Sequence, residues 1–598
     1  MSGVLTWAQL REVKCSELED AADGWGRASN RADAARDRID KQLLAGLAAS
    51  QEGEAAEAAV TRLRELSRNF QYVYTECGLV RTTLNSFAFE LRGTQRKLVD
   101  ALDDAEVLKF TVHEDGSVSF PAGGENALTR EELPGGKAAG SAVPPLLAPP
   151  PAFTGPSPNP NAAKAQDIAD RIARAVSEAR AVDLQYTGTL RKLTAQDGLK
   201  VTDAMWTDAS GDATAVRDLA SDYLADAIPG DKTPAERKAW WDGLTQEERE
   251  EYLAVYPDRI GNVDGIPAEV RDAANRDNLQ LLMGKLEGQG DEKSQTRLAG
   301  LRSIDEQLRA GGNPPMYLLG IGDEGNGRAI VAYGNPDTAR NVSAYVPGLG
   351  TALDEDFAKN DLKRARDTAV GAQKYDESSA AIVWLGYDAP QAPDNEKLTG
   401  NFAVMGTAQA ERGAPAYNSF MSGLEATNQN DDVHLTAIGH SYGSRTVGAA
   451  AQQEGGIPGA DDIILVGSPG VGVDRAEDLG VAKDHVFVGA AENDPVTKLP
   501  SKQQVALAVA AGPAGAYFAG EAGDAGDDDL WFGKDPASEA FGARRFEVAD
   551  GPRPFLDGEG AAPAHSNYFN PEKDLVSADN VALIVSGKPQ YIKGSEWR

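Results

Sequence analysis

The stretch "HLTAIGHSYGSRTVG" (residues 434–448) places Ser441 between two glycines directly after an apolar run. The run "VHLTAI" predicts a strand, and "SRTVGAAAQQEGG" predicts a helix with small residues in its first turns. This context is typical of a nucleophile elbow, formed here by Gly439, His440, Ser441 and Gly443, because so tight a turn leaves room only for small neighbours. The competing interpretation is a glycine-rich turn that only happens to contain a serine.

Eight short apolar runs surround this turn in the second half of the chain. They read "MYLLGI", "GRAIVAYG", "VSAYVPG", "SAAIVWLG", "VHLTAIGH", "DDIILVGS", "HVFVGAA" and "ARRFEVA". The later runs alternate with helical segments, which predicts an α/β fold: a mostly parallel eight-stranded sheet with helices on both faces, spanning residues 311–598. Ligands of such sheets bind at the carboxyl ends of the strands, so the site is expected there.

A serine nucleophile requires a base, and the chain has only five histidines. His113 lies outside the predicted sheet region, and His434 and His485 begin strands at the wrong end. His440 adjoins the serine, but neighbouring residues of an elbow point in different directions. By elimination, His565, in a loop beyond the last strand, is the predicted base.

The acid that orients this base is expected just after a strand. In "HVFVGAAENDPV", Glu492, Asp494 and Pro495 follow such a strand. We select Asp494, which the following proline holds in an extended or turn conformation, with Glu492 as the alternative. The order Ser441, Asp494, His565 is the chain order of α/β-hydrolases. Taken alone, Asp494 also fits a solvated turn aspartate.

Acyl transfer also needs hydrogen-bond donors for the oxygen that becomes negatively charged. One predicted donor is the backbone N–H of Tyr442, the residue after the nucleophile. The other is expected in "VSAYVPGLGTALDED", where Gly348 and Gly350 allow the backbone to approach a ligand, and we favour the N–H of Leu349.

The composition of the chain restricts the kinds of molecule that it is expected to bind. The 598 residues are too many for one hydrophobic core, and the formal net charge of −33 argues against a nucleic-acid partner. The two cysteines, Cys15 and Cys77, exclude a disulfide framework or a cysteine-based zinc site. No metal-ligand spacing or phosphate-binding loop is apparent, so we predict no metal and no cofactor. A small-molecule or lipid-like acyl compound is the expected substrate.

The sequence predicts neither a Sec signal peptide nor a transmembrane segment. The first 20 residues lack the basic and apolar regions of a Sec signal peptide, which favours the cytoplasm, with export by a type VII system as the alternative. The apolar stretch at 505–520 is short and broken by Pro513, so no transmembrane segment is predicted.

The first half of the chain is predicted to be mainly helical. Two apolar stripes, Leu18 to Ile39 and Leu63 to Ala101, flank a break at Gly53 and predict an antiparallel helical hairpin over residues 1–106. The remaining predicted regions are a β-hairpin at 107–132, a Pro/Gly-rich linker at 133–162 and helices at 163–310 that pack on the catalytic domain.

Several ordered motifs resemble one family. "GHSYGSRTVG", "DDIILVGSPGVGV", "HVFVGAAENDPV", "FGARRFEV" and the upstream "WWDGLTQEE" and "IGNVDGIPAEVRDAANR" look like actinobacterial α/β-hydrolases with a GHSYGS elbow, long catalogued as a domain of unknown function. The resemblance covers roughly 235–570 and implies a serine hydrolase, with Ser441, Asp494 and His565 where that family's triad is expected. It leaves 501–529 as an extra segment suited to a lid.

The N-terminal hairpin is similar to the WxG helical-hairpin proteins of type VII secretion. It has Gln51-Glu52-Gly53 where those proteins carry Trp-x-Gly, and its Tyr72-to-Glu76 pattern lies inside the second helix. The hairpin therefore suits pairing with another helical protein or with a second copy of itself.

Two functions follow from these observations. The first is a serine hydrolase with an acyl-enzyme intermediate, acting on carboxylic esters in preference to amides. The alternative is a type VII-linked interaction or effector protein, in which the hairpin mediates assembly and the hydrolase fold is secondary.

Overall fold

The computed structural model describes residues 5–44, 46–47, 52–126, 129–142, 159–193, 200–224, 228–391, 406–501, 529–554, 556–557 and 562–597. The chain divides into two compact units. The first comprises Met1–Val201 and Gly211–Ile228, and the second comprises Thr202–Ser210 and Pro229–Arg598. Within the described residues, no helix has both the length and the apolar character needed to cross a membrane.

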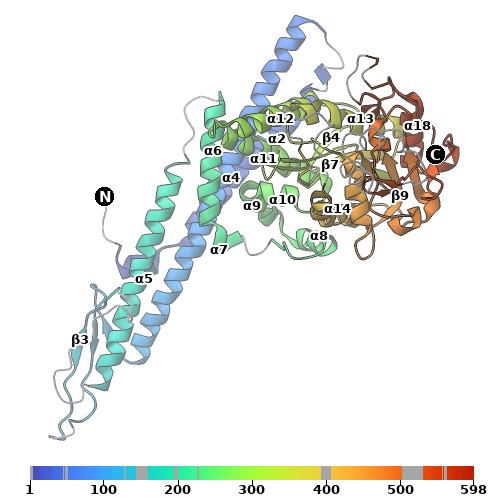
Figure 1. The fold of residues 1–598 in the computed structure, drawn as a ribbon. Coiled ribbons are helices and arrows are strands. Elements are labelled where there is room, and N and C mark those ends of the chain that lie inside the picture. Colours follow the sequence, from blue (N-terminus) through green and yellow to red (C-terminus); the bar gives the residue numbers. More distant parts are fainter. Residues whose placement is uncertain are drawn as a thin grey trace. The chain divides into compact units, whose positions relative to one another are not determined.

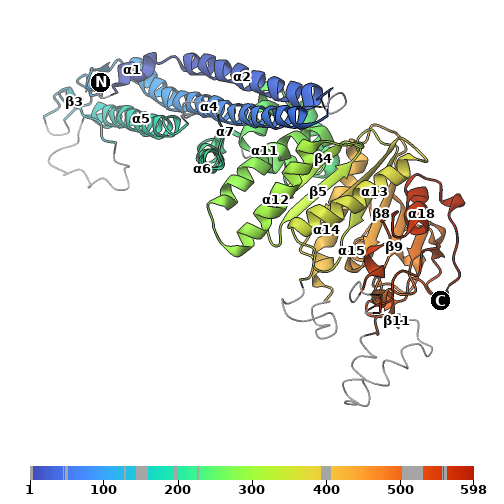
Figure 2. The same cartoon turned by 90° about the horizontal axis from the view of Figure 1, so that it is seen from above.

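A long helical pair forms the first unit (Figures 1 and 2). After the short α1 (Trp7–Glu12), α2 (Cys15–Arg38) continues into a π-helical turn (Ile39–Leu44), and α4 (Glu54–Val107) begins after Gly53. Glu19 pairs with Arg92 at 2.9 Å, while Ser29 Oγ donates to the carbonyl oxygen of Tyr74 at 2.9 Å. Because the partner number falls as the α2 number rises, the two helices run antiparallel.

The helix α5 (Pro160–Leu190) packs on the second half of α4. Tyr186 stacks on Phe87 with 5.0 Å between ring centroids, and its hydroxyl lies 2.7 Å from Ser86 Oγ. The sequence prediction grouped this helix with the region that packs on the catalytic domain, whereas the structure places it in the first unit. The reason is its apolar stripe, which shares a core with α4 through Ile168, Ile172, Ala175 and Ala179.

A small sheet closes this unit. Strands β1 (Thr111–Val112) and β2 (Val118–Phe120) pair antiparallel around a turn in which Gly116 has φ +80°. Strand β3 (Gly136–Ala138), which lies inside the predicted linker, pairs with β2, so part of that segment is folded. The Pro-rich portion at 143–158 lies outside the described residues. The unit also contains α6 (Asp203–Leu219) from Gly211 onward and α7 (Ser221–Leu224).

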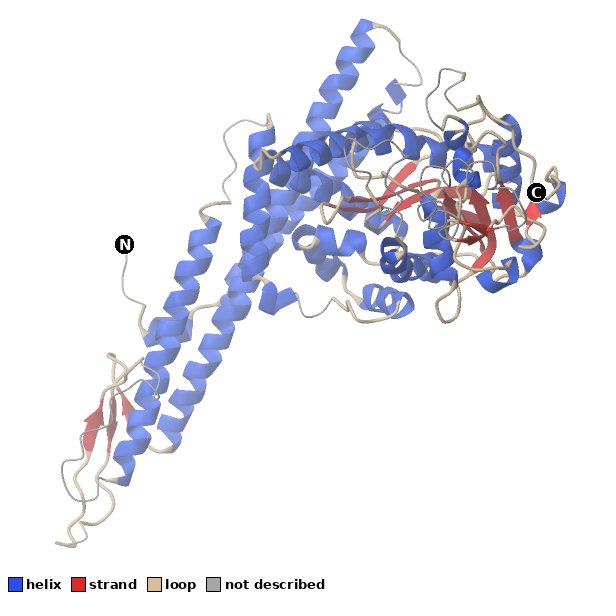
Figure 3. Cartoon of the chain, in the orientation of Figure 1, coloured by secondary structure: helices blue, strands red, loops and turns tan. Residues whose placement is uncertain are grey.

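The second unit is built on an eight-stranded sheet, and each predicted run supplies one strand (Figure 3). The strands are β4 (Met316–Gly322), β5 (Arg328–Tyr333), β6 (Asn341–Val346), β7 (Ser379–Leu385), β8 (His434–His440), β9 (Ala460–Val466), β10 (Val486–Gly489) and β13 (Arg544–Arg545). Their order is β13-β10-β9-β8-β6-β7-β5-β4. The pairs β4–β5 and β5–β7 are antiparallel and the others are parallel, which confirms the mostly parallel sheet.

Helices cover both faces of this sheet. One core contains apolar residues of α14 (Ala408–Thr427) and α15 (Tyr442–Ala451). The other core contains residues of α11 (Ala268–Glu287), α12 (Glu292–Ala310), α13 (Leu362–Gln373) and α18 (Leu575–Val585), of which α13 and α18 lie side by side (Figure 2). Shorter helices α8 (Pro234–Gly243), α9 (Gln246–Val255) and α10 (Pro257–Asn262) precede α11, and Thr245 with Glu248 forms a capping box at the start of α9.

The amino-terminal edge of the sheet holds two of the histidines. His434 Nε2 lies 2.8 Å from Asp462 Oδ2, and His485 Nδ1 lies 2.7 Å from Asp462 Oδ1. Asp462 itself is buried. Both histidines therefore bind a structural carboxylate on β9 at the edge opposite the elbow, in agreement with their elimination as a base.

The hydrogen bond between His434 and Asp462 predicts that the free energy of unfolding depends on pH. Burial alone lowers the pKa of His434, but the hydrogen bond to Asp462 and the charge of that residue raise it more, so the pKa lies above the ordinary 6.5. The stabilisation is therefore complete below pH 6.5 and is lost as the pH rises through the raised value. In urea unfolding between pH 6 and 9, wild type should lose stability relative to His434→Gln. His113→Gln serves as the control, and parallel curves for wild type and His434→Gln would contradict this account.

Candidate active site

Ser441 lies at the predicted elbow in a strained backbone conformation. It separates β8 from α15 and has φ 55° and ψ −130°, where a side chain is rarely found. Such strain costs on the order of 1–3 kcal/mol and is concentrated at functional sites. The N–H of Ser441 donates to the carbonyl oxygen of Val466 on β9 at 3.1 Å, which ties the turn to the neighbouring strand.

The flanking glycines are required by close backbone approach. A Cβ added to Gly439 would lie 2.5 Å from Ser444 Cα, and one added to Gly443 would lie 2.0 Å from the Val346 carbonyl oxygen. In both cases the obstacle is backbone that cannot rotate away. The structure therefore explains both glycines sterically, as expected for a sharp strand-to-helix turn.

His565 and Asp494 meet in the structure. His565, in a short 3₁₀ turn (Ala564–Ser566), lies with Nδ1 2.9 Å from Asp494 Oδ2. Asp494 precedes the 3₁₀ turn Pro495–Lys498 and accepts the N–H of Val496 on Oδ1 at 2.9 Å. Glu492, the alternative acid, instead pairs with Lys498 at 2.5 Å on the surface. The carboxylate that reaches the imidazole is that of Asp494.

Asp494 is fully buried and ionised. Burial by itself raises its pKa, but the facing His565 ring and the hydrogen bonds from His565, Tyr568 and Val496 together hold its pKa below the ordinary value. A carboxylate that stays charged in this position favours the imidazole tautomer with its proton on Nδ1, which leaves Nε2 free to accept a proton.

His440 packs against the ring and the backbone of His565. Its ring stacks on that of His565 with 4.6 Å between centroids, and its Nε2 lies 2.8 Å from the His565 carbonyl oxygen, to which it donates. Burial, and then the charges of His565 and Arg364, lower the pKa of His440 well below its ordinary value, so this imidazole is neutral. The sequence assigned His440 only to the turn, and its contact with the predicted base comes from the tertiary fold.

The serine and the His–Asp pair share one edge of the sheet. A Cβ on Gly467, the residue after Val466, would lie 2.9 Å from His565 Nδ1 and 3.0 Å from Asp494 Oδ2. The carbonyl oxygen of Val466 accepts the N–H of Ser441. The adjacent residues Val466 and Gly467 therefore lie against the Ser441 turn and against the His565–Asp494 pair, respectively. Among the described residues, Ser441 Oγ makes no direct hydrogen bond with His565. Such contacts are often loose before a substrate binds.

The two predicted oxyanion donors lie on the segments expected. Gly348, in the loop after β6, covers the serine so closely that a Cβ there would lie 2.6 Å from Ser441 Cβ and 3.0 Å from its Oγ. The next residue, Leu349, is half-buried. Across the described part of the chain, neither the Leu349 N–H nor the Tyr442 N–H donates to a protein acceptor. Both are therefore available to a ligand.

Tyr568 is a residue of this site that the sequence did not single out. Its hydroxyl donates to Asp494 Oδ2 at 2.7 Å, and it follows His565 by three residues. The 3₁₀ turn ends at Ser566, so Tyr568 lies just beyond it, and the contact depends on the irregular backbone that follows. The sequence alone gave no reason to place a helical turn there.

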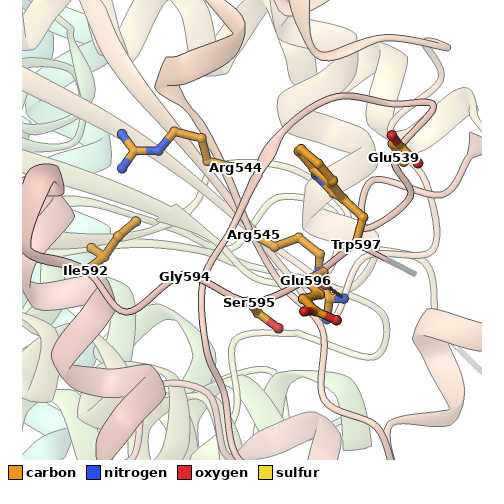
Figure 4. A pocket seen from close by; sticks show the side chains of 8 residues that line it. All are labelled: Glu539, Arg544, Arg545, Ile592, Gly594, Ser595, Glu596 and Trp597. Carbon is orange, nitrogen blue, oxygen red and sulfur yellow. Dashed lines mark hydrogen bonds between the residues drawn. The ribbon is translucent and has the colours of Figure 1, made fainter.

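A separate cavity of about 820 Å³ lies beside β13 (Figure 4). Its lining includes Arg544, Arg545 and Trp597, and none of the three proposed catalytic side chains. Arg544 donates to the carbonyl oxygen of Pro589, and Arg545 to that of Glu596, so these cations already have acceptors. Among the described residues, no cluster of three or more His, Cys, Asp or Glu side chains could hold a metal ion.

Comparison with known proteins assigns the family. A family model described as "Alpha/beta hydrolase" matches residues 323–504, a segment that holds the elbow and Asp494. The uncharacterized protein Rv0963c of Mycobacterium tuberculosis is 35% identical over 209 residues, which cover 33% of this chain and 74% of that protein. The chain belongs to the α/β-hydrolase family. Its membership supports hydrolase activity.

A longer match extends over more of this chain. The uncharacterized protein Rv2079 of Mycobacterium tuberculosis is 29% identical over 401 residues, which cover 60% of this chain. The matched region spans only 56% of that relative, a little over half of its length. An uncharacterized protein of Mycobacterium bovis, Mb0988c, is 35% identical over 209 residues, again with 33% of this chain and 74% of the relative covered.

The strain at Ser441 predicts a stability gain on substitution. Glycine adopts φ +55° without strain, so Ser441→Gly should raise the free energy of unfolding by about 1 kcal/mol, even after the added flexibility of glycine in the unfolded chain. Ser441→Ala keeps a Cβ and should show no such gain. Denaturant unfolding of the two variants provides the measurement, and a glycine variant less stable than the alanine variant would show that the turn is relaxed.

Proposed function

We propose that this protein is a serine hydrolase that uses Ser441, His565 and Asp494 as a catalytic triad. Ser441 Oγ attacks the carbonyl carbon of an acyl substrate while His565 Nε2 accepts the hydroxyl proton. The tetrahedral intermediate collapses to an acyl-enzyme, and His565 returns that proton to the departing alcohol. Water, deprotonated by the same imidazole, then attacks the acyl-enzyme and releases the acid and free Ser441.

The observation that carries this proposal is the Asp494–His565 hydrogen bond at the sheet edge that bears the elbow. A buried, ionised carboxylate on Nδ1 fixes the tautomer that makes Nε2 a base. A solvated turn aspartate, the competing interpretation, would not be fully buried or carry hydrogen bonds from three side-chain and backbone donors.

Stabilisation of the developing oxyanion is assigned to the N–H groups of Tyr442 and Leu349. The Tyr442 N–H starts α15, where the helix dipole favours negative charge. The Leu349 N–H follows the glycine that touches the serine. Removal of one such donor typically costs on the order of 100- to 1000-fold in rate.

We propose carboxylic esters, with small-molecule or lipid-like acyl groups, as the substrate class. An alcohol leaves a tetrahedral intermediate more readily than an amine does, which favours esters over amides as substrates. The proposed chemistry needs only water as co-substrate, and we assign it no cofactor. The segment predicted as a lid, 501–529, lies almost wholly outside the described residues.

Hydrolysis of 4-nitrophenyl butyrate tests this function. Ser441→Ala and His565→Gln should each lower kcat by on the order of a thousand-fold or more, because the triad acts as a unit. His485→Gln removes a histidine on Asp462, away from the proposed site, and should retain full activity. If Ser441→Ala hydrolyses the ester as fast as wild type, the proposal is wrong.

The helical hairpin supports a second candidate, recognition of a helical partner or self-association. Trp25 on α2 is 45% exposed, although tryptophan usually packs or binds. In this interpretation the hairpin directs assembly, including a type VII-linked role, and hydrolysis is secondary.

Sedimentation velocity over a range of protein concentrations tests self-association. Wild type should show a concentration-dependent larger species that Trp25→Gln weakens by about ten-fold, as expected for loss of an interface tryptophan. Trp597→Gln removes a tryptophan of similar exposure in the other unit and is the control. A single species at all concentrations would remove self-association and leave only a heterologous partner.

A further inference from the structure

Tyr568 occupies an unusual position beside the His–Asp pair. Its hydroxyl and His565 Nδ1 approach the same oxygen of Asp494, Oδ2, at 2.7 and 2.9 Å. The other oxygen, Oδ1, accepts the N–H of Val496. The side chain of Tyr568 is buried, so water does not compete for these contacts.

The direction of the Tyr568 hydrogen bond is determined by its second partner. The N–H of Ala491, at the end of β10, donates to the Tyr568 hydroxyl oxygen at 3.0 Å. An amide N–H can only donate, and the tyrosine hydroxyl has one hydrogen. That hydrogen is therefore directed to Asp494. The hydrogen bonds therefore run from the Ala491 amide through the Tyr568 hydroxyl to Asp494 Oδ2, which also accepts the N–H of His565 Nδ1.

We propose that Tyr568 is a positioning residue for catalysis: it holds Asp494 Oδ2 in place and limits how strongly that oxygen stabilises protonated His565. This inference rests on the proposed triad and adds a residue to it. The segment 565–568 then supplies both the base and a second donor to the acid. Because the two residues are only three positions apart in the chain, a shift of this segment moves base and donor together.

Among the polar side chains around the Asp494–His565 pair in the described part of the chain, Tyr568 is the one whose hydroxyl donates to the Asp494 carboxylate. His440, from the end of β8, faces the His565 ring and is neutral. Behind it, Arg364 is bonded to Asp361 at 2.7 Å and to the Tyr345 hydroxyl at 3.1 Å, and Tyr345 lies 6.3 Å from the His440 ring. The positive charge of Arg364 is therefore already paired with the negative charge of Asp361, whereas the Tyr568 hydroxyl donates directly to Asp494.

The test uses the rate of labelling by a fluorophosphonate probe as a function of pH. Tyr568→Phe should lower the labelling rate constant at neutral pH by on the order of ten-fold. It should also move the acid limb of the profile to higher pH by on the order of half a unit, because an Asp494 oxygen without this donor stabilises the protonated imidazole more strongly. A residue that only supports the fold would change the amount of active protein without moving the limb.

Tyr375 provides a matched control. Its hydroxyl donates to Asp579 at 2.5 Å, so Tyr375→Phe removes the same kind of hydrogen bond at a distant place. This variant should label with the wild-type profile. If Tyr568→Phe fails to fold, 3-fluorotyrosine at position 568 keeps the ring and hydroxyl but donates more strongly, and should move the acid limb to lower pH.

The outcomes separate this inference from the proposed function. A folded wild type that does not label overturns the proposed function, and the role of Tyr568 with it. A wild type that labels at Ser441, while Tyr568→Phe labels with the same rate constant and the same acid limb, overturns only the positioning role. A reduced rate together with the shifted limb supports it.

Discussion

The left-handed backbone of Ser441 is the constraint on which the site depends. The chain leaves β8 and enters α15 within one residue, which packs the turn tightly. A Cβ would therefore meet Ser444 if added to Gly439, Val346 of β6 if added to Gly443, and Ser441 if added to Gly348. The same turn directs the serine to the carboxyl edge of the sheet. The strained backbone at Ser441 thus fixes the position of the nucleophile, and the favourable packing around the turn offsets the free-energy cost of that strain.

The neighbouring strands bring the remaining groups to that edge. The parallel pairs β8–β9 and β9–β10 place Val466 and Gly489 level with the elbow, and Asp494 follows β10 directly. His565 and Tyr568 then close over the carboxylate from a later turn. An ionised, fully buried Asp494 is stable here only because every oxygen has a donor, and that saturation also holds the imidazole in a single orientation.

The parts of this arrangement that depend on local sequence could be predicted. Apolar runs separated by helical segments identified all eight strands, and the glycines around Ser441 identified the elbow. Asp494 followed from its place after a strand and His565 from elimination among the five histidines, and the structure joins the two side chains. The stack of His440 on His565, the Tyr568 contact and the assignment of α5 to the first unit depend on residues far apart in the chain or on an irregular turn. Periodicity carries no information about such contacts.

The most direct test of a nucleophilic Ser441 is the site of covalent attachment. The protein would be reacted with a fluorophosphonate, digested and analysed by mass spectrometry, so that the modified residue is identified within the peptide around the elbow. The account predicts a single stoichiometric adduct on Ser441 that disappears in His565→Gln. An adduct on another serine, such as Ser468, or an adduct on Ser441 that forms equally well without His565, would contradict the proposed triad.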